Sequence, residues 1–321
     1  MSVPKAELHV HVEGAASPDL VRRIAERNRL RVPDGVIGDD GKFVWKDFLD
    51  FLDTYDAATS VIRTPEDYRD IVYEYLVGCA AEGAIYVELT ASADHAADVG
   101  LSDDEHLGAL AQGIDDARAE TGIEGRIVMS CVRHFGPDKA REVARRTVEF
   151  PHHYVTGFGM GGDEAGFPPG EFADAFAIAR EGGLGLTVHA GEWAGPESVR
   201  GGLALGVSRI GHGVRASEDP ELVRELADRG TVLEVCPTSN VVLGLYPSYE
   251  AHPLRVLRDA GVAVTLGSDD PPYWDASIGG EYEVAAERMG FDDEALREVT
   301  RTALRAAFVE EDVRRRLLDL V

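Results

Sequence analysis

Histidines and acidic residues stand at the ends of several short apolar segments of this sequence, where they form a set that can bind a metal. His9 and His11 are two positions apart, so in a β-strand both side chains project from the same face. An isolated pair of this kind is usually two hydrogen-bonded core histidines. Here His189 and Asp269 end two later segments, and imidazole and carboxylate ligands with an open position suit catalytic zinc. We therefore predict one zinc ion per chain, bound by His9, His11, His189 and Asp269, although iron, cobalt or manganese would fit the same ligands.

Glu192 is the first candidate for proton transfer. It follows His189 by three positions, and Gly191 between them permits a tight turn back toward the metal. Zinc lowers the pKa of a bound water to about 7, so an acid beside it can exchange a proton with a substrate. The competing explanation is an ordinary acidic residue before a helix that starts at Pro196.

Two more residues complete the candidate catalytic set. His212 can act as a base or as an electrostatic stabiliser of a bound hydroxide. Asp270 follows Asp269 and cannot share its face in regular strand geometry, so one of them would bind metal while the other hydrogen-bonds water or substrate. The remaining six histidines lie in loops, in helices or away from strand ends, and surface or capping roles are predicted for them: His95, His106, His134, His152, His153 and His252.

The segment 156–164 argues for a single metal. In many metal-dependent barrel hydrolases, a modified lysine at the end of the fourth strand bridges two metals. The segment 156–164, which corresponds to that strand here, contains no lysine. Its glycines, Gly161 and Gly162, would let a flat ligand approach the backbone closely.

The elements that must position these residues alternate along the chain. Strands followed by amphipathic helices predict βα units and a parallel sheet, and eight such units suit a (β/α)₈ TIM barrel with its active site at the C-terminal ends of the strands. We predict strands at 6–12, 85–91, 126–132, 154–160, 184–189, 208–212, 231–236 and 262–268. Helices are predicted at 17–29, 64–82, 102–120, 137–149, 171–182, 196–206, 219–229 and 252–260.

No linker or low-complexity segment interrupts this pattern, so residues 1–321 are predicted to form one domain. The stretch 31–60 is too long for a simple connection between the first strand and the helix at 64–82, and it contains an apolar, aromatic cluster. We expect extra helices there and at the C-terminus. The stretch 31–60 is predicted to be a lid over the barrel mouth, an additional packed helix, or both.

Several motifs, in order along the chain, resemble the adenosine/adenine deaminase family of the metal-dependent hydrolase superfamily. They are the segments 4–14 (PKAELHVHVEG), 162–164 (GDE), 189–192 (HAGE), 211–213 (GHG), 236–240 (CPTSN) and 268–271 (SDDP). Each motif is weak alone, but the ordered set is specific and covers the chain from about residue 4 to residue 310.

The resemblance implies a mechanism and assigns roles to individual residues. One zinc would be held by the predicted ligands, and the residue matching Glu192 would protonate N1 of a purine. Water activated by the zinc, assisted by the residues matching His212 and Asp270, would attack C6 and displace ammonia. The substrate-binding residues implied are Glu13, which can reach the sugar in nucleoside-specific members, and Gly162, Asp163 and Asp270 around the base.

Two sequence signals for the substrate conflict. The family acts on adenosine, 2′-deoxyadenosine, adenine or aminodeoxyfutalosine. The turn 162–164 is typical of nucleoside deaminases, whereas 165–169 resembles the adenine and aminodeoxyfutalosine enzymes. We predict hydrolytic deamination of adenosine and 2′-deoxyadenosine, releasing ammonia and, from adenosine, inosine, with adenine or aminodeoxyfutalosine as the alternative. Another metal-dependent amide hydrolase and a non-catalytic purine-binding protein are less favoured.

Composition restricts the partners. The net charge of −26 would repel nucleic-acid backbones and anionic membranes, and the family resemblance implies a small purine as the partner. The three cysteines, Cys79, Cys131 and Cys236, are far apart and show no C-x-x-C spacing, which predicts reduced thiols in a cytoplasmic protein. No oligomeric state follows from the sequence.

Overall fold

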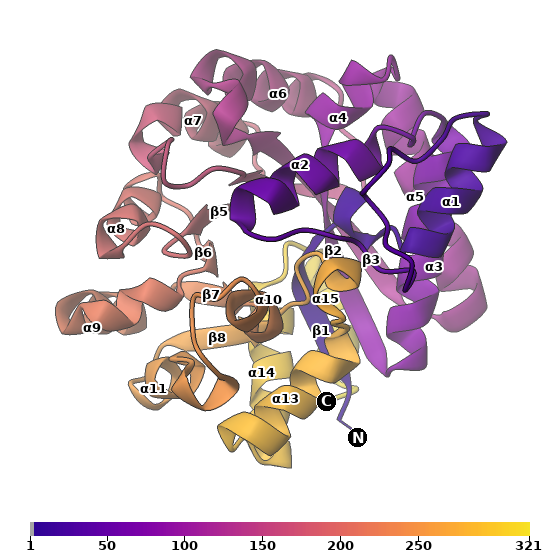
Figure 1. The fold of residues 1–321 in the computed structure, drawn as a ribbon. Coiled ribbons are helices and arrows are strands. Elements are labelled where there is room, and N and C mark those ends of the chain that lie inside the picture. The colour runs from indigo at the N-terminus through magenta and orange to yellow at the C-terminus, as the bar shows by residue number, and fades with distance from the viewer. Residues whose placement is uncertain (1–2) are drawn as a thin grey trace.

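The computed structural model describes residues 3–321; Met1 and Ser2, where the predicted domain begins, lie outside the described residues. Eight parallel strands stand in chain order around a barrel (Figure 1). The strands are β1 (Lys5–His11), β2 (Ala84–Ser92), β3 (Glu124–Val132), β4 (Val155–Gly161), β5 (Gly185–Ala190), β6 (Arg209–His212), β7 (Val232–Val235) and β8 (Ala263–Leu266).

The barrel closes between β1 and the segment after β8. The backbone N–H of His11 donates to the carbonyl oxygen of Asp269 at 2.9 Å, and the N–H of Asp269 donates to the carbonyl oxygen of His9 at 3.1 Å. The predicted (β/α)₈ TIM barrel is therefore confirmed, and the closing bonds place three predicted metal ligands side by side.

Eight helices lie where they were predicted. Each end of these helices is within two residues of its predicted position. They are α1 (Pro18–Arg27), α3 (Pro65–Ala81), α5 (Asp103–Thr121), α6 (Pro137–Glu149), α7 (Ala173–Glu181), α8 (Pro196–Ala204), α9 (Pro220–Arg229) and α11 (Leu254–Asp259). Their starts are set by local chemistry. At α3, the Thr64 hydroxyl accepts from the N–H of Asp67, and the Asp67 carboxylate accepts from the N–H of Thr64.

Extra helices lie where the sequence predicted them. In the stretch 31–60, α2 (Phe48–Thr59) crosses the mouth of the barrel (Figure 1). At the C-terminus, α13 (Ile278–Met289), α14 (Asp293–Ala306) and α15 (Glu311–Leu318) follow the last strand. Leu304 of α14 and Leu317 of α15 pack with Ala6 and Leu8 of β1 in a second apolar cluster, so the end of the chain packs against its first strand.

Three short helices were not predicted: α4 (Ala93–Asp98), α10 (Pro237–Val242) and α12 (Pro271–Trp274). Each begins within a few residues of a strand end, and none is long enough to show a helical period in the sequence. In residues 3–321, no helix combines the length and the apolar character that a membrane crossing requires.

Candidate active site

Four side chains from three places on the barrel converge at its mouth. His9 and His11 come from the end of β1, His189 from β5, and Asp269 from the segment after β8. The Nε2 atom of His11 lies 3.2 Å from Nε2 of His189 and 3.3 Å from Oδ1 of Asp269. Nε2 of His9 lies 3.5 Å from the same oxygen. Ligand atoms about 2.0–2.1 Å from a tetrahedral zinc lie ~3.3–3.4 Å from one another, so these separations match a shared cation.

The outer atoms of these side chains are held by hydrogen bonds, which leaves the inner atoms directed at one point. Nδ1 of His9 lies 3.0 Å from Oε2 of Glu234, and Nδ1 of His189 lies 3.0 Å from the carbonyl oxygen of Met160. The hydroxyl of Ser239 donates to Oδ2 of Asp269 at 2.7 Å. Nε2 of His9, in contrast, is buried with no hydrogen-bond partner in the described part of the chain. Such outer-shell bonds are what orients metal-binding imidazoles and carboxylates.

The charge distribution also favours a cation here. Burial lowers the pKa of His9, but the neighbouring carboxylates of Asp269 and Glu234 outweigh burial and raise this pKa to about 10. Burial and the neighbouring imidazoles of His9 and His11 hold the pKa of His189 well below its usual value. Carboxylates thus make the centre attractive to positive charge while His189 stays neutral, as a ligand must. The donor set fits a divalent cation.

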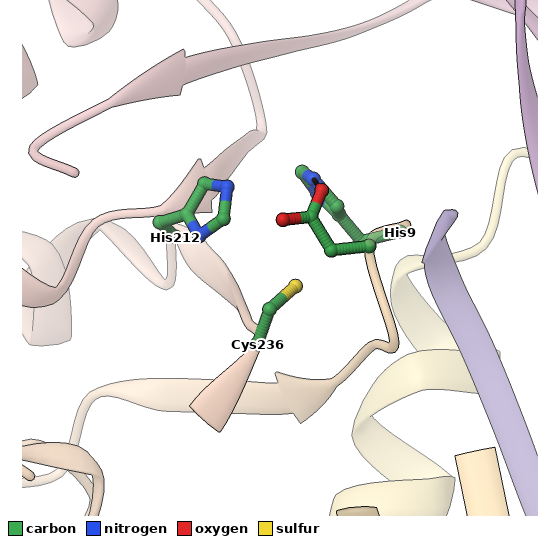
Figure 2. A group of neighbouring side chains, drawn as sticks. His9, His212 and Cys236 are labelled. Carbon is green, nitrogen blue, oxygen red and sulfur yellow. Dashed lines mark ion pairs between the residues drawn. The ribbon is translucent and has the colours of Figure 1, made fainter. Parts of the chain in front are cut away.

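A second group of possible ligand atoms overlaps the first. His212 and Cys236 approach His9 and Asp269, with all four atoms within 4.8 Å of one another. Figure 2 shows His9, His212 and Cys236 pointing toward one another. However, burial and the charge of Asp269 raise the pKa of the Cys236 thiol well above its usual value. Only a thiolate binds metal, so the group with His11 and His189 is the better cation site.

Glu192 faces the mouth from a tight turn after β5. Gly191 has φ +76°, a conformation that disfavours other residues. The Glu164 carboxylate accepts from the N–H groups of Glu192 at 3.0 Å and Trp193 at 2.7 Å, and so holds the turn. α8 starts at Pro196 without Glu192 as a cap. Burial, then the charges of Asp269 and Glu164, raise the pKa of Glu192 well above its usual value, which favours its acid form.

Asp270 lines the same cavity as Asp269, contrary to the expectation from regular strand geometry. β8 ends at Leu266, and Asp269 has φ +65°, so both carboxyl groups turn toward the mouth. A Cβ added to Gly14 would lie 1.8 Å from Oδ1 of Asp270, so only glycine leaves room for this carboxyl group. Burial and the charge of Asp269 raise the pKa of Asp270 to about 8.

A cavity of about 100 Å³ lies between the strand ends and α2. Its walls include Glu13, Gly162, Glu192, His212 and Asp270 along with three of the four metal-centre residues. α2 is both a lid over the barrel mouth and an additional packed helix, the two possibilities predicted for the stretch 31–60. Its aromatic residues line the cavity and also pack on the barrel, with the Phe48 and Trp193 ring centroids 4.4 Å apart.

Asp163, a predicted substrate-binding residue, is not among the residues that line the cavity. Its Oδ1 accepts from the N–H of Gly166 at 3.1 Å, which stabilises the turn after β4. Glu13 lines the cavity, but its Oε1 accepts from the N–H of Ser92 at 3.3 Å. The structure therefore brings Glu13 into the site and leaves Asp163 beside it.

Sequence reasoning missed two histidines in the cavity wall. His95 on α4 and His134 after β3 line the cavity, although surface or capping roles were predicted for both. Nε2 of His95 lies 3.5 Å from Oδ1 of Asp56 on α2, so it connects the barrel to the lid helix. Glu234 was missed as well, although a carboxylate within the buried segment Val232–Val235 is a visible signal.

Known proteins are similar to this chain in sequence and in fold. The adenosine deaminase family model matches residues 4–321. Adenine deaminase of Chelativorans sp. (strain BNC1) is 50% identical over 311 residues, covering 97% of this chain and 95% of that protein. Adenine deaminase of Sinorhizobium medicae is 49% identical over 315 residues, covering 98% and 97%.

Solved structures agree. The adenine deaminase from Arthrobacter aurescens has a TM-score of 0.92 at 29% identity, over 99% of this chain and 97% of that one. An amidohydrolase from Burkholderia ambifaria with bound Zn has a TM-score of 0.89 at 27% identity, over 98% and 88%. Fold and site thus define a metal-dependent hydrolase barrel. The chain belongs to the adenosine deaminase family, as its motifs predicted, and it is a deaminase.

Proposed function

We propose that this protein is a zinc-dependent adenine deaminase, which hydrolyses the 6-amino group of the free base and releases ammonia. The cavity of about 100 Å³ carries the proposal, because it places Glu192, Asp270 and the cation ligands around one small space. Pockets for drug-sized ligands are about 300–1,000 Å³, so a cavity of this size under α2 favours a small substrate.

The relatives support adenine over the adenosine that the sequence motifs favoured. The curated relatives described above are named adenine deaminase, and so is the similar structure from Arthrobacter aurescens. The Glu13 carboxylate, the candidate sugar contact, already accepts from the backbone of Ser92. The alternative reading of the sequence therefore becomes the main one.

The residues present divide the chemistry among themselves. His9, His11, His189 and Asp269 would hold one zinc ion, whose Lewis acidity lowers the pKa of water and supplies a nucleophile at neutral pH. Protonated Glu192 donates to a ring nitrogen of the base, which makes the amino-bearing carbon more electrophilic. Asp270 and His212 face the side where water adds, and the backbone at Gly162 contacts the base edge.

Initial rates on three substrates test the proposal. Zinc-loaded protein is given adenine, adenosine and aminodeoxyfutalosine in parallel, and ammonia release is measured together with the ultraviolet change at the purine. We expect kcat/KM to be highest for adenine. A higher kcat/KM for adenosine would overturn the assignment of the free base. The Glu192→Gln protein, which keeps the ligand set, serves as the control for background deamination.

A further inference from the structure

Three buried side chains form a hydrogen-bonded chain that leads away from the site. Nδ1 of His212 lies 3.2 Å from Nδ2 of Asn240, and Oδ1 of Asn240 lies 3.1 Å from Nε2 of His252. At the far end, the backbone N–H of Leu254 donates to Nδ1 of His252 at 3.2 Å. His212, Asn240 and His252 are all buried, with exposures of 1%, 0% and 4%. The cavity lies at one end of this chain and α11 at the other.

The donors and acceptors along these hydrogen bonds can be assigned in only one way. The N–H of Leu254 can only donate, so Nδ1 of His252 accepts. Burial lowers the pKa of His252 to about 3, so its ring is neutral and carries its one proton on Nε2. That Nε2–H donates to the Asn240 carbonyl, which turns the amide nitrogen toward His212. The Asn240 amide then donates to Nδ1 of His212.

We infer that Asn240 and His252 are positioning residues that hold His212 with its proton on Nε2, the atom that lies 3.7 Å from Oε2 of Glu192 at the cavity wall. The inference rests on the proposed function for its catalytic consequence. In the deamination, His212 donates a hydrogen bond to the oxygen that adds to the base, and the proton of that water passes to Asp270, the other group on this side of the cavity. Of the two roles that the sequence left open for His212, this selects the stabiliser.

A comparison with serine hydrolases shows why the amide matters. There, a carboxylate accepts from Nδ1–H of a histidine, which frees Nε2 to act as a base, and replacing that carboxylate with an amide lowers kcat about 10⁴-fold because the wrong tautomer forms. In this protein the amide is the native partner of His212. A histidine with its proton on Nε2 also cannot bind metal through that atom. The group formed with Cys236 is then excluded as a cation site.

Nitrogen NMR of the zinc-loaded protein tests the tautomer directly. Long-range ¹H–¹⁵N spectra of histidine rings distinguish a proton on Nε2 from one on Nδ1, independently of any activity. We expect Nε2–H for His212 and for His252 in the wild type. A proton on Nδ1 of His212 would overturn the inference even if adenine is deaminated. A proton on Nε2 would support the inference about the tautomer even if adenine is not the substrate.

The Asn240→Asp variant reverses the direction of the hydrogen bond between residue 240 and Nδ1 of His212. A carboxylate only accepts, so His212 would place its proton on Nδ1 and present a lone pair to the cavity. We expect kcat for adenine to fall about 10²-fold, the usual loss when one donor to a developing oxyanion is removed, with zinc content and KM unchanged. A variant that keeps or raises kcat would show that His212 acts as a base and would contradict the inference.

A matched pair of buried histidines separates positioning from stability. His252 and His106 are 4% and 2% exposed, and burial lowers the pKa of both. His106 lies on α5 and is not among the residues that line the cavity. His252→Leu should lower kcat about tenfold, as loss of an outer-shell partner does, and mix the His212 tautomers. His106→Leu should change neither. Equal effects of the two variants would reduce the role of His252 to packing.

Discussion

The barrel interior contains two layers of buried charged residues: ion pairs between an arginine and two glutamates below the mouth, and polar atoms without a hydrogen-bond partner at the mouth itself. Below the mouth, Arg209 of β6 lies 2.6 Å from Glu88 of β2 and 2.7 Å from Glu234 of β7, and all three side chains are essentially inaccessible. At the mouth, Nε2 of His9 and Oδ1 of Asp270 are buried without a hydrogen-bond partner in residues 3–321. Because an unpaired buried polar atom is costly, the mouth is built for something that binds there.

Glu234 links the two layers. One of its oxygens faces Arg209 below, and the other lies 3.0 Å from Nδ1 of His9 above. In the proposed function, the ion-paired layer fixes the ring orientation of His9 as a metal ligand, and the residues at the mouth carry out the chemistry. We therefore expect substitutions in the lower layer to act mainly on stability, and substitutions in the upper layer to act mainly on metal binding and rate.

Asp269→Ala should have the largest effect. It removes a ligand and leaves the three histidines crowded around one point, so we expect the metal content measured by elemental analysis to fall sharply and turnover to disappear with it. Asp163→Ala is the matched control, since Asp163 lies near the mouth but does not line the cavity. Full zinc occupancy in Asp269→Ala would remove this residue from the ligand set.

Glu192→Gln should separate rate from binding. The amide occupies the same volume but has no acidic proton, so kcat should fall about 10²–10⁴-fold while zinc content and melting temperature stay unchanged. Steady-state kinetics on adenine measure the first quantity and thermal unfolding the second. If the rate stays near that of the wild type, Glu192 is not the acid.

Arg209→Met tests the lower layer. It leaves the carboxylates of Glu88 and Glu234 buried without their cation, and breaking a buried pair in this way costs about 3–5 kcal/mol of unfolding free energy. Denaturant unfolding measures the loss. The control is Arg288→Met, which breaks an exposed ion pair with Glu250 and should leave the midpoint unchanged. Equal midpoints for the two variants would contradict the distinction between the layers.

Glu281 of α13 carries the last prediction, which concerns the pH dependence of stability. Both of its oxygens lie 3.3 Å from the N–H of Thr238, and burial raises its pKa from 4.5 to about 8. The folded state therefore binds a proton that the unfolded state releases, so this residue makes the unfolding free energy fall as pH rises from about 4.5 to about 8.

Glu281→Gln removes this titration. The stability of the variant relative to the wild type should increase across that pH interval, as measured by urea unfolding at several pH values. A constant difference would mean that Glu281 does not carry the proton.

The metal side of the site could be predicted because each predicted ligand lies near the end of a strand or just after it, and strand ends meet at the mouth of a (β/α)₈ barrel. The lid side could not. Tyr55 lies on α2, whose position across the mouth depends on aromatic packing against distant segments, and His95 lies on a helix of six residues that shows no period. The choice between adenosine and adenine could not be made from the motifs for the same reason, since the shape of the cavity depends on where α2 packs.

Anomalous X-ray diffraction at the zinc edge, from crystals of the zinc-loaded protein, tests the central claim most directly. We expect one peak per chain, in contact with Nε2 of His9, His11 and His189 and a carboxylate oxygen of Asp269. A peak beside His212 and Cys236, two peaks, or none at all would contradict the account of the mouth as a single cation site.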